Sequence, residues 1–185
     1  ILKPEDRVAI KPHASPVFHA IQYLLGNQTK DKLLNFRGFD GAQSYPSRTK
    51  DTDDVDFSTG SVGLGGAVTI FASLIQDYII EHNISPPKFK KGKMVALFGD
   101  AELDEGNVYE ALLEGAKQNV KNCWWIIDYN RQSLDAIVTD TLKLRIDELF
   151  ESMDWRLITL KFGKKLQNIS KKPGGKEILT WIDNC

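Results

Sequence analysis

The chain has few cysteines, no excess of either charge and no long apolar run. Its 185 residues include two cysteines, Cys123 and Cys185, too few for a disulfide framework. We therefore expect a reducing, cytoplasmic setting, with Cys123 as a buried thiol at the head of an apolar stretch. The 24 basic and 25 acidic residues give a net charge of −1. That balance argues against a nucleic-acid-binding protein, a class that usually carries a basic excess.

Membrane and secretion signals are also missing from the sequence. No apolar run reaches the roughly 18 residues of a membrane span, and the opening ILKPEDRVAIKP is too polar for a signal peptide. The chain starts at Ile1 without a methionine and ends at Cys185 directly after a helical pattern. We expect a single domain over residues 1–185 that is a fragment of a longer chain. Such a fragment can carry a binding site without the complete activity.

The most informative stretch runs over residues 94–132. An apolar run at 94–98 ends in a glycine, which is typical of a buried strand in a parallel sheet. A helical pattern follows, and a second apolar run at 123–127 comes after it. In a strand–helix–strand unit the two strands are parallel, so Asp100 and Asn130 are predicted to lie at the same edge of the sheet. Open α/β sheets bind their ligands at that edge.

The two predicted neighbours offer one kind of chemistry. Carboxylate and amide oxygens are hard ligands that suit magnesium or calcium rather than zinc. Magnesium is usually held by one or two protein oxygens together with substrate phosphate, so the residues indicate a magnesium-bridged phosphate site. An alternative remains open at this point, in which Asp100 caps the following helix and Asn130 makes an ordinary turn.

The remaining chain gives a coarser pattern. Pro16 suits the first turn of a helix, with Ser15 as its N-cap and an apolar face that includes Val17 and Ile21. The other predicted elements are a long loop over 35–56, an apolar helix within 58–80, a connector over 81–93, a helix over 141–150, a strand over 155–160, a loop over 164–176 and a helix start over 177–182. Together they indicate an α/β domain without internal repeats.

Several side chains have both a functional and a structural interpretation. His13 is either a turn histidine or a functional one, whereas His19 is expected to be structural and His82 solvated. Arg37 and Arg48 in the long loop are either solvated or available to an anionic substrate. Glycines 60, 63, 65 and 66 precede the apolar helix, but they form no G-x-G-x-x-G fingerprint. Close packing of a buried helix explains these glycines equally well.

Gly99-Asp100, followed by Asn130 thirty positions later, resembles the thiamine diphosphate motif, which begins Gly-Asp-Gly and ends in Asn. The segments GDAELDEG and DYNRQSLD are similar to segments of transketolases and of the homodimeric decarboxylating subunit of pyruvate dehydrogenase. The resemblance implies a magnesium ion held by Asp100, Asn130, the main-chain oxygen of Gln132 and the cofactor diphosphate. It also implies that Gly99, Ala101 and Glu102 lie along the diphosphate. Ala101 departs from the family, which has glycine there.

Other segments carry the resemblance further along the chain. His-Ala-Ser-Pro resembles the family's early His-x-Ser segment, which implies that His13 points at the reactive ring and that Ser15 belongs to the cofactor site. STGSVGLG matches the segment that contacts the aminopyrimidine, with Gly60 and Val62 as the contact positions. In the loop that resembles the family's active-site cover, Ser47 stands where a second histidine is common.

The resemblance implies the α/β thiamine diphosphate-binding fold, a three-layer, doubly wound, mostly parallel sheet with helices on both faces. It implies cleavage or transfer at a carbon–carbon bond next to a carbonyl, with thiamine diphosphate as electron sink. The substrate would be a 2-oxoacid, as for pyruvate dehydrogenase, or a ketose phosphate, as for transketolase. The pyrimidine-binding domain with the activating glutamate lies outside this chain, so a homodimeric parent and an inactive fragment are expected. The alternatives are a non-catalytic paralogue that acts as an assembly or regulatory module, and a generic nucleotide-binding domain.

Overall fold

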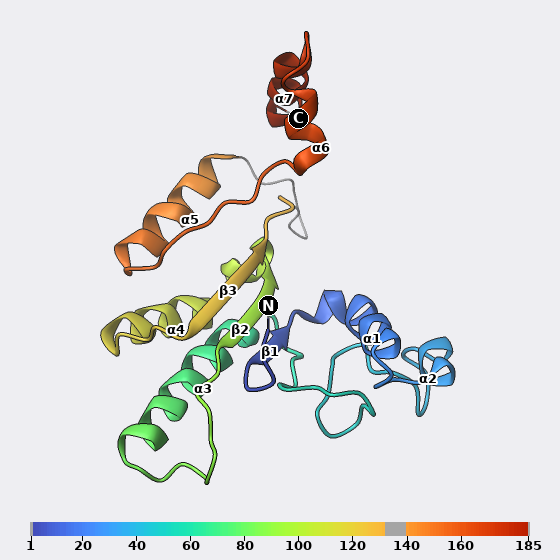
Figure 1. Ribbon diagram of the computed structural model, residues 1–185, viewed down its shortest axis with the longest axis vertical. Coiled ribbons are helices and arrows are strands. Elements are labelled where there is room, and N and C mark those ends of the chain that lie inside the picture. Colours follow the sequence, from blue (N-terminus) through green and yellow to red (C-terminus); the bar gives the residue numbers. More distant parts are fainter. Residues whose placement is uncertain (1, 132–139, 185) are drawn as a thin grey trace. The chain divides into compact units, whose positions relative to one another are not determined.

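The computed structural model describes residues 2–131 and 140–184 (Figure 1). The chain divides into two compact units, Ile1–Arg145 and Ile146–Cys185, and each is considered by itself. The first unit contains the sheet and the candidate site. In chain order the elements are β1 (Arg7–Ile10), η1 (Pro12–Ala14), α1 (Ser15–Leu24), α2 (Lys30–Leu34), α3 (Leu64–Glu81), β2 (Met94–Gly99), η2 (Asp100–Asp104), α4 (Gly106–Lys117), β3 (Cys123–Asp128), α5 (Asp140–Ser152), α6 (Lys164–Ile169) and α7 (Gly175–Asn184).

The sheet of the first unit has β2 at its centre and β1 and β3 on either side, all parallel. Ala96 pairs with Ala9 on one side and with Trp125 on the other, and Gly99 pairs with Asp128. The carboxyl ends of the strands therefore reach one edge of the sheet, as the strand–helix–strand pattern predicted. The α/β class and the parallel sheet are confirmed.

Helix α3 covers the sheet face that carries Trp125. A Cβ on Gly66 would lie 3.2 Å from the Trp125 ring, so glycine lets the helix approach closely. The indole Nε1 of Trp125 also donates to Thr69 Oγ1 over 3.1 Å. Helix α4 packs on α3 in turn, because Gly115 leaves room for Ile70. Close packing thus explains Gly65 and Gly66 at the start of α3.

By length and composition α3 is apolar enough to cross a membrane, and within residues 2–131 and 140–184 no other helix meets that criterion. Core helices of globular proteins meet it as well. The buried positions of α3 include Ile70, Ser73 and Gln76, and the helix contacts the sheet and α4. We therefore interpret α3 as a core helix of the domain.

Three local predictions need correction. Residues 155–160 form irregular chain instead of a strand, with Ile158 74% and Leu160 93% exposed, because no neighbouring strand pairs with them in the described residues. Residues 164–169, predicted as loop, form α6. The N-cap of α1 is Ala14 and not Ser15, because the turn η1 leads directly into the helix. The apolar face of α1 lies exposed, with Val17 at 62%, whereas Ser15 and His19 are buried.

Candidate functional site

Asp100 joins the loops that follow two neighbouring strands. Its carboxylate is 7% exposed and lies at the carboxyl end of β2. Oδ1 accepts a hydrogen bond from Ala101 N over 3.1 Å, and Oδ2 accepts one from Arg131 N over 2.6 Å. The two ends of the predicted motif therefore meet at the sheet edge. The capping alternative fails for α4, whose N-cap is Glu105.

Asn130 is exposed in the loop directly after β3, where its N–H donates to Asp128 O over 3.1 Å. The next residue, Arg131, takes a left-handed φ of 62°, and its N–H donates to Asp100 Oδ2. Each carboxylate oxygen of Asp100 accepts one backbone bond and retains a second lone-pair direction. A hard cation fits this set of carboxylate and amide oxygens. Gln132, the third predicted ligand, lies outside the described residues.

Glu102 is buried and connects two segments that the sequence singled out separately. Its Oε1 accepts from Gly99 N over 3.2 Å, and its Oε2 accepts from Gly63 N over 2.9 Å. The carboxylate is 7% exposed. Protein backbone therefore already engages both oxygens of a side chain that was predicted to lie along the diphosphate. Sequence patterns gave no sign of this bond across 39 positions.

Ala101 occupies its position without backbone strain. The residue lies in η2, half-buried, and it is absent from the residues with a left-handed φ in the described chain. Glycine is required where φ is positive or where a side chain would collide with a neighbour. The conformation of η2 is open to any L residue, so the departure from the family motif leaves the local backbone intact.

Residues 59–63, directly before α3, are exposed in the middle of the segment and fixed at its two ends. Gly60 is exposed, with open space where a Cβ would stand, and Val62 is half-buried. On one side Thr59 Oγ1 donates to Ile10 O over 2.6 Å. On the other side Gly63 takes a φ of 80° and a Cβ there would lie 2.9 Å from Glu105. We call residues 60–62 the arch.

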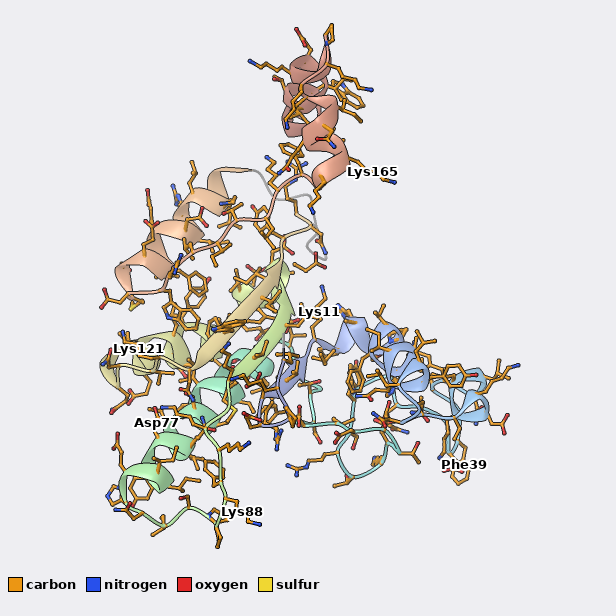
Figure 2. The ribbon with its side chains drawn as sticks, in the orientation of Figure 1. Lys11, Phe39, Asp77, Lys88, Lys121 and Lys165 are labelled. Carbon is orange, nitrogen blue, oxygen red and sulfur yellow. The ribbon has the colours of Figure 1, made fainter. Side chains whose placement is uncertain are left out.

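The end of β1 contributes a charged pair that the sequence analysis missed. Lys11, labelled in Figure 2, follows the strand. Its Nζ lies 2.7 Å from Oδ2 of Asp128, the residue that pairs with Gly99 at the end of β3. A Cβ on Gly99 would lie 3.6 Å from that Nζ, so the ammonium adjoins the first motif residue. His13 follows in η1 and is exposed, whereas Ser15 is 2% exposed. His13 thus lies exposed two residues after Lys11, and the Ser15 side chain is buried.

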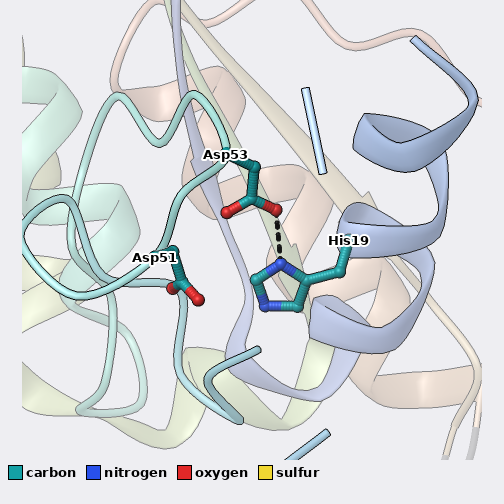
Figure 3. A group of neighbouring side chains, drawn as sticks. All are labelled: His19, Asp51 and Asp53. Atoms are coloured by element: carbon teal, nitrogen blue, oxygen red, sulfur yellow. Dashed lines mark hydrogen bonds and ion pairs between the residues drawn. The ribbon is translucent and has the colours of Figure 1, made fainter. Parts of the chain in front are cut away.

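A second cluster, formed by His19, Asp51 and Asp53, lies between α1 and the long loop (Figure 3). His19 Nδ1 lies 2.5 Å from Asp53 Oδ2, and Nε2 lies 2.8 Å from Gln43 O. Both ring nitrogens therefore face oxygen atoms of the long loop. Asp51 in turn accepts the backbone N–H groups of Gln43 and Ser47. These bonds hold the loop to α1, which confirms the structural interpretation of His19.

Two further predictions on single residues are confirmed. His82 is exposed and its ring stacks on Tyr78 with 4.0 Å between centroids. Cys123 is a buried free thiol, and its burial raises the pKa of the thiol to about 11. A thiol with so high a pKa is unreactive at neutral pH. Arg37 and Arg48 are both exposed in the loop, as either of their interpretations requires.

Comparison with known proteins identifies the family. The family model for the transketolase thiamine diphosphate binding domain matches residues 5–173. The chain belongs to this family. The match includes Asp100 and the loop of Asn130, the arch and the end of β1, so the candidate site lies wholly inside the family domain. The resemblance carried by the sequence motifs is confirmed.

The curated relatives of this transketolase-family domain are enzymes several times longer. The chain is 29% identical over 177 residues to the pyruvate dehydrogenase E1 component of Haemophilus influenzae, which covers 92% of the chain and 20% of the relative. It is 30% identical over 174 residues to that of Buchnera aphidicola, covering 90% and 19%. It is 28% identical to that of Escherichia coli, covering 90% and 19%. The chain thus spans about a fifth of the length of these relatives.

Solved structures show the same fold. A transketolase from Leishmania mexicana superposes with a TM-score of 0.71 at 21% identity, covering 97% of the chain and 27% of that structure. A transketolase mutant from Pichia stipitis gives 0.69 at 22% identity, covering 84% and 23%. The fold of the chain is therefore the α/β thiamine diphosphate-binding fold of transketolases.

Proposed function

We propose that this domain holds the diphosphate and magnesium of thiamine diphosphate in an enzyme that cleaves or transfers at a carbon–carbon bond next to a carbonyl. One observation carries the proposal: the Asp100 carboxylate bonds to Arg131 N, so an aspartate and the residue after Asn130 meet at the ligand-binding edge of the sheet. The cofactor, when bound, supplies the electron sink for the carbon chemistry. The domain supplies the binding groups and their orientation.

The residues take separate roles in this proposal. Asp100, Asn130 and the main-chain oxygen of Gln132 would hold magnesium, and Gly99 and Ala101 would line the diphosphate. Gly99 ends β2 and Ala101 lies in η2, so the two residues flank Asp100, and the oxygens of Asp100 retain lone pairs for a cation.

The arch and the end of β1 would serve the other half of the cofactor. Gly60 and Val62 would contact the aminopyrimidine, which suits the open space around Gly60. His13 would donate or accept a proton near the reactive ring, and its exposure in η1 suits that role. Ser15, whose side chain is buried, would support the site from inside the domain.

We favour a 2-oxoacid substrate over a ketose phosphate. The curated relatives named above are pyruvate dehydrogenase E1 components, and the solved structures, transketolases, resemble the chain at lower identity. The reaction would then be a decarboxylation, an oxidoreductase activity in its full complex. Transketolase-type two-carbon transfer stays the alternative substrate class. Cys123, a buried free thiol, suits a cytoplasmic protein.

A partner domain would complete the site. The outward side of α3 exposes Phe71 (49%), Ile75 (62%) and Tyr78 (56%). Together with α4 these side chains line an open groove of about 870 Å³. Apolar surface of this kind is typical of an interaction site. We propose that the pyrimidine-binding domain of the same protein, from the second subunit of a homodimer, covers it, and that the domain alone lacks turnover.

Calorimetric titration of thiamine diphosphate tests the proposal. The full-length protein and the 185-residue chain are titrated with and without Mg²⁺, as wild type, Asp100→Ala and the matched control Asp104→Ala. Asp104 is an exposed carboxylate of the same short helix. Magnesium-dependent binding that Asp100→Ala abolishes and Asp104→Ala retains is expected. Full-length protein that binds no cofactor would instead favour a non-catalytic paralogue.

A further inference from the structure

The structure assigns Glu102 a role different from cofactor contact: it is a positioning residue that, together with Thr59, holds the arch of residues 60–62 at the sheet edge. The inference rests on the proposed function, because the arch is the segment proposed to contact the aminopyrimidine. Thr59 fixes the arch to the end of β1, and Glu102 fixes it to the end of β2. The arch itself stays open between these two anchors.

The geometry at Glu102 suits a rigid anchor. One oxygen accepts Gly63 N over 2.9 Å and the other accepts Gly99 N over 3.2 Å. Hydrogen bonds to an ionised carboxylate are stronger than those between neutral groups, and burial strengthens them further. Gly63 is the N-cap of α3, so the carboxylate also lies at the positive end of an 18-residue helix. The start of α3 is thereby occupied by a protein carboxylate, which leaves the diphosphate to the loop after β2.

The backbone at Gly63 has a conformation that only glycine can adopt in these surroundings. Its left-handed φ of 80° is accessible to glycine, and a Cβ would lie 2.9 Å from Glu105 and 3.0 Å from Val108. At the other end Thr59 is 5% exposed, and its hydroxyl donates to Ile10 O over 2.6 Å. Gly60, in contrast, has no neighbouring atom within 4 Å of its Cβ position. A segment with buried ends and an open middle is suited to present its backbone to a ligand ring.

Two nearly isosteric substitutions, Glu102→Gln and Thr59→Val, test the anchors separately. Glutamine retains one acceptor oxygen and turns an NH₂ group toward the second backbone N–H, and valine removes the hydroxyl donor. Each leaves a buried polar group without its partner, so the affinity for thiamine diphosphate should fall about tenfold. The affinity for inorganic pyrophosphate with Mg²⁺, which bypasses the arch, should change by less than about twofold in Thr59→Val. Glu102→Gln also disturbs Gly99 beside the diphosphate, so it should lose some pyrophosphate affinity but more thiamine diphosphate affinity. Glu151→Gln, an exposed position on α5, serves as the control.

The measurement is calorimetry on the full-length protein with both ligands, with circular dichroism melting to verify folding. Selective loss of thiamine diphosphate affinity in both variants supports the inference. Equal losses for pyrophosphate and thiamine diphosphate, or wild-type affinities throughout, overturn it while leaving the proposed function in place. Wild-type protein that binds neither ligand overturns the proposed function itself. Should Glu102→Gln fail to fold, Thr59→Val, which leaves the β2 loop untouched, decides the question.

Discussion

The two ends of the same sheet use their polar groups differently. At the amino ends of the strands, the side-chain amide of Gln76 donates to Gly92 O and accepts from Gly92 N, both over 2.8 Å. Asn122 adds a third bond to Gly92 O over 3.3 Å. At the carboxyl ends lie three carboxylates: Asp100 and Glu102 accept backbone N–H groups, and Asp128 pairs with the ammonium of Lys11.

The difference separates stability from binding. The polar groups at the amino ends, which include the Gln76 amide and the buried Asp6 carboxylate, are occupied by backbone groups and so fix the fold. Carboxylates gathered at a sheet edge attract a cation. Mutations at the two ends should therefore have opposite signatures, one in the free energy of unfolding and the other in cofactor affinity.

The largest effect is expected at the charged end. Asp100→Asn removes the charge while keeping the shape, and it should abolish measurable magnesium-dependent binding. Loss of a residue that only hydrogen-bonds to a metal ligand already lowers metal affinity about 10–100-fold, and loss of a ligand should cost more. The melting temperature should fall modestly, because the asparagine NH₂ faces one of the two backbone N–H groups that Asp100 accepts. Titration calorimetry and thermal melts on the same samples check both halves. Retained binding would remove Asp100 from the metal site.

A strong chemical contrast is expected at the opposite end, at Cys123. Its pKa of about 11, raised by burial, leaves at least about 100-fold less thiolate at pH 8 than a free thiol has. In a Cys185→Ser background, alkylation of the native protein should be slower than that of the denatured protein by that factor. Because the folded state disfavours the thiolate, stability should be full below about pH 9 and should fall as the pH rises toward 11. Native labelling at the denatured rate would contradict the burial of Cys123.

Gln76→Ala should sharpen the stability side of the comparison. It leaves both polar groups of Gly92 without their glutamine partner and should lower the free energy of unfolding by about 2–3 kcal/mol. Cofactor affinity of the folded protein should be unchanged. Urea denaturation measures the first quantity and calorimetry the second. Gln167→Ala, exposed on α6, is the control and should stay within about 0.5 kcal/mol.

The smallest effect is expected for Ala101→Gly. Because Ala101 has no left-handed φ, glycine offers no conformational relief, and its greater flexibility should cost about 0.5–1 kcal/mol of stability. Thiamine diphosphate affinity should change by less than about threefold. A large gain in affinity would mean that the alanine blocks the diphosphate, which would strengthen the non-catalytic alternative.

The unit of β2, α4 and β3 could be predicted from sequence because its signals are local. Apolar runs, the glycine after β2 and helical periodicity each depend on neighbouring residues. The resemblance added the site residues, and the strand topology placed Asp100 beside the loop of Asn130. The role of Gln132 stays a prediction, as do the proposed contacts of His13.

What the sequence analysis missed depends on contacts between distant positions. Strand β1 has four residues and is recognisable only through its pairing with β2. The bonds from Glu102 to Gly63 and from Lys11 to Asp128 span 39 and 117 positions. The strand predicted at 155–160 failed for the same reason, since an apolar alternation becomes a strand only when a neighbour pairs with it.

The register of the sheet also has a consequence for the order of folding. Met94 pairs with Cys123 but also with Arg7, so β1 must find a partner 87 positions away while β3 finds one only 29 away. Closing the longer loop costs more chain entropy, which favours nucleation in the β2–α4–β3 unit and late docking of β1. During synthesis β1 leaves the ribosome first and waits roughly 4–17 s for β2 at 5–20 residues per second. For that interval the nascent chain carries an unpaired strand next to the future site.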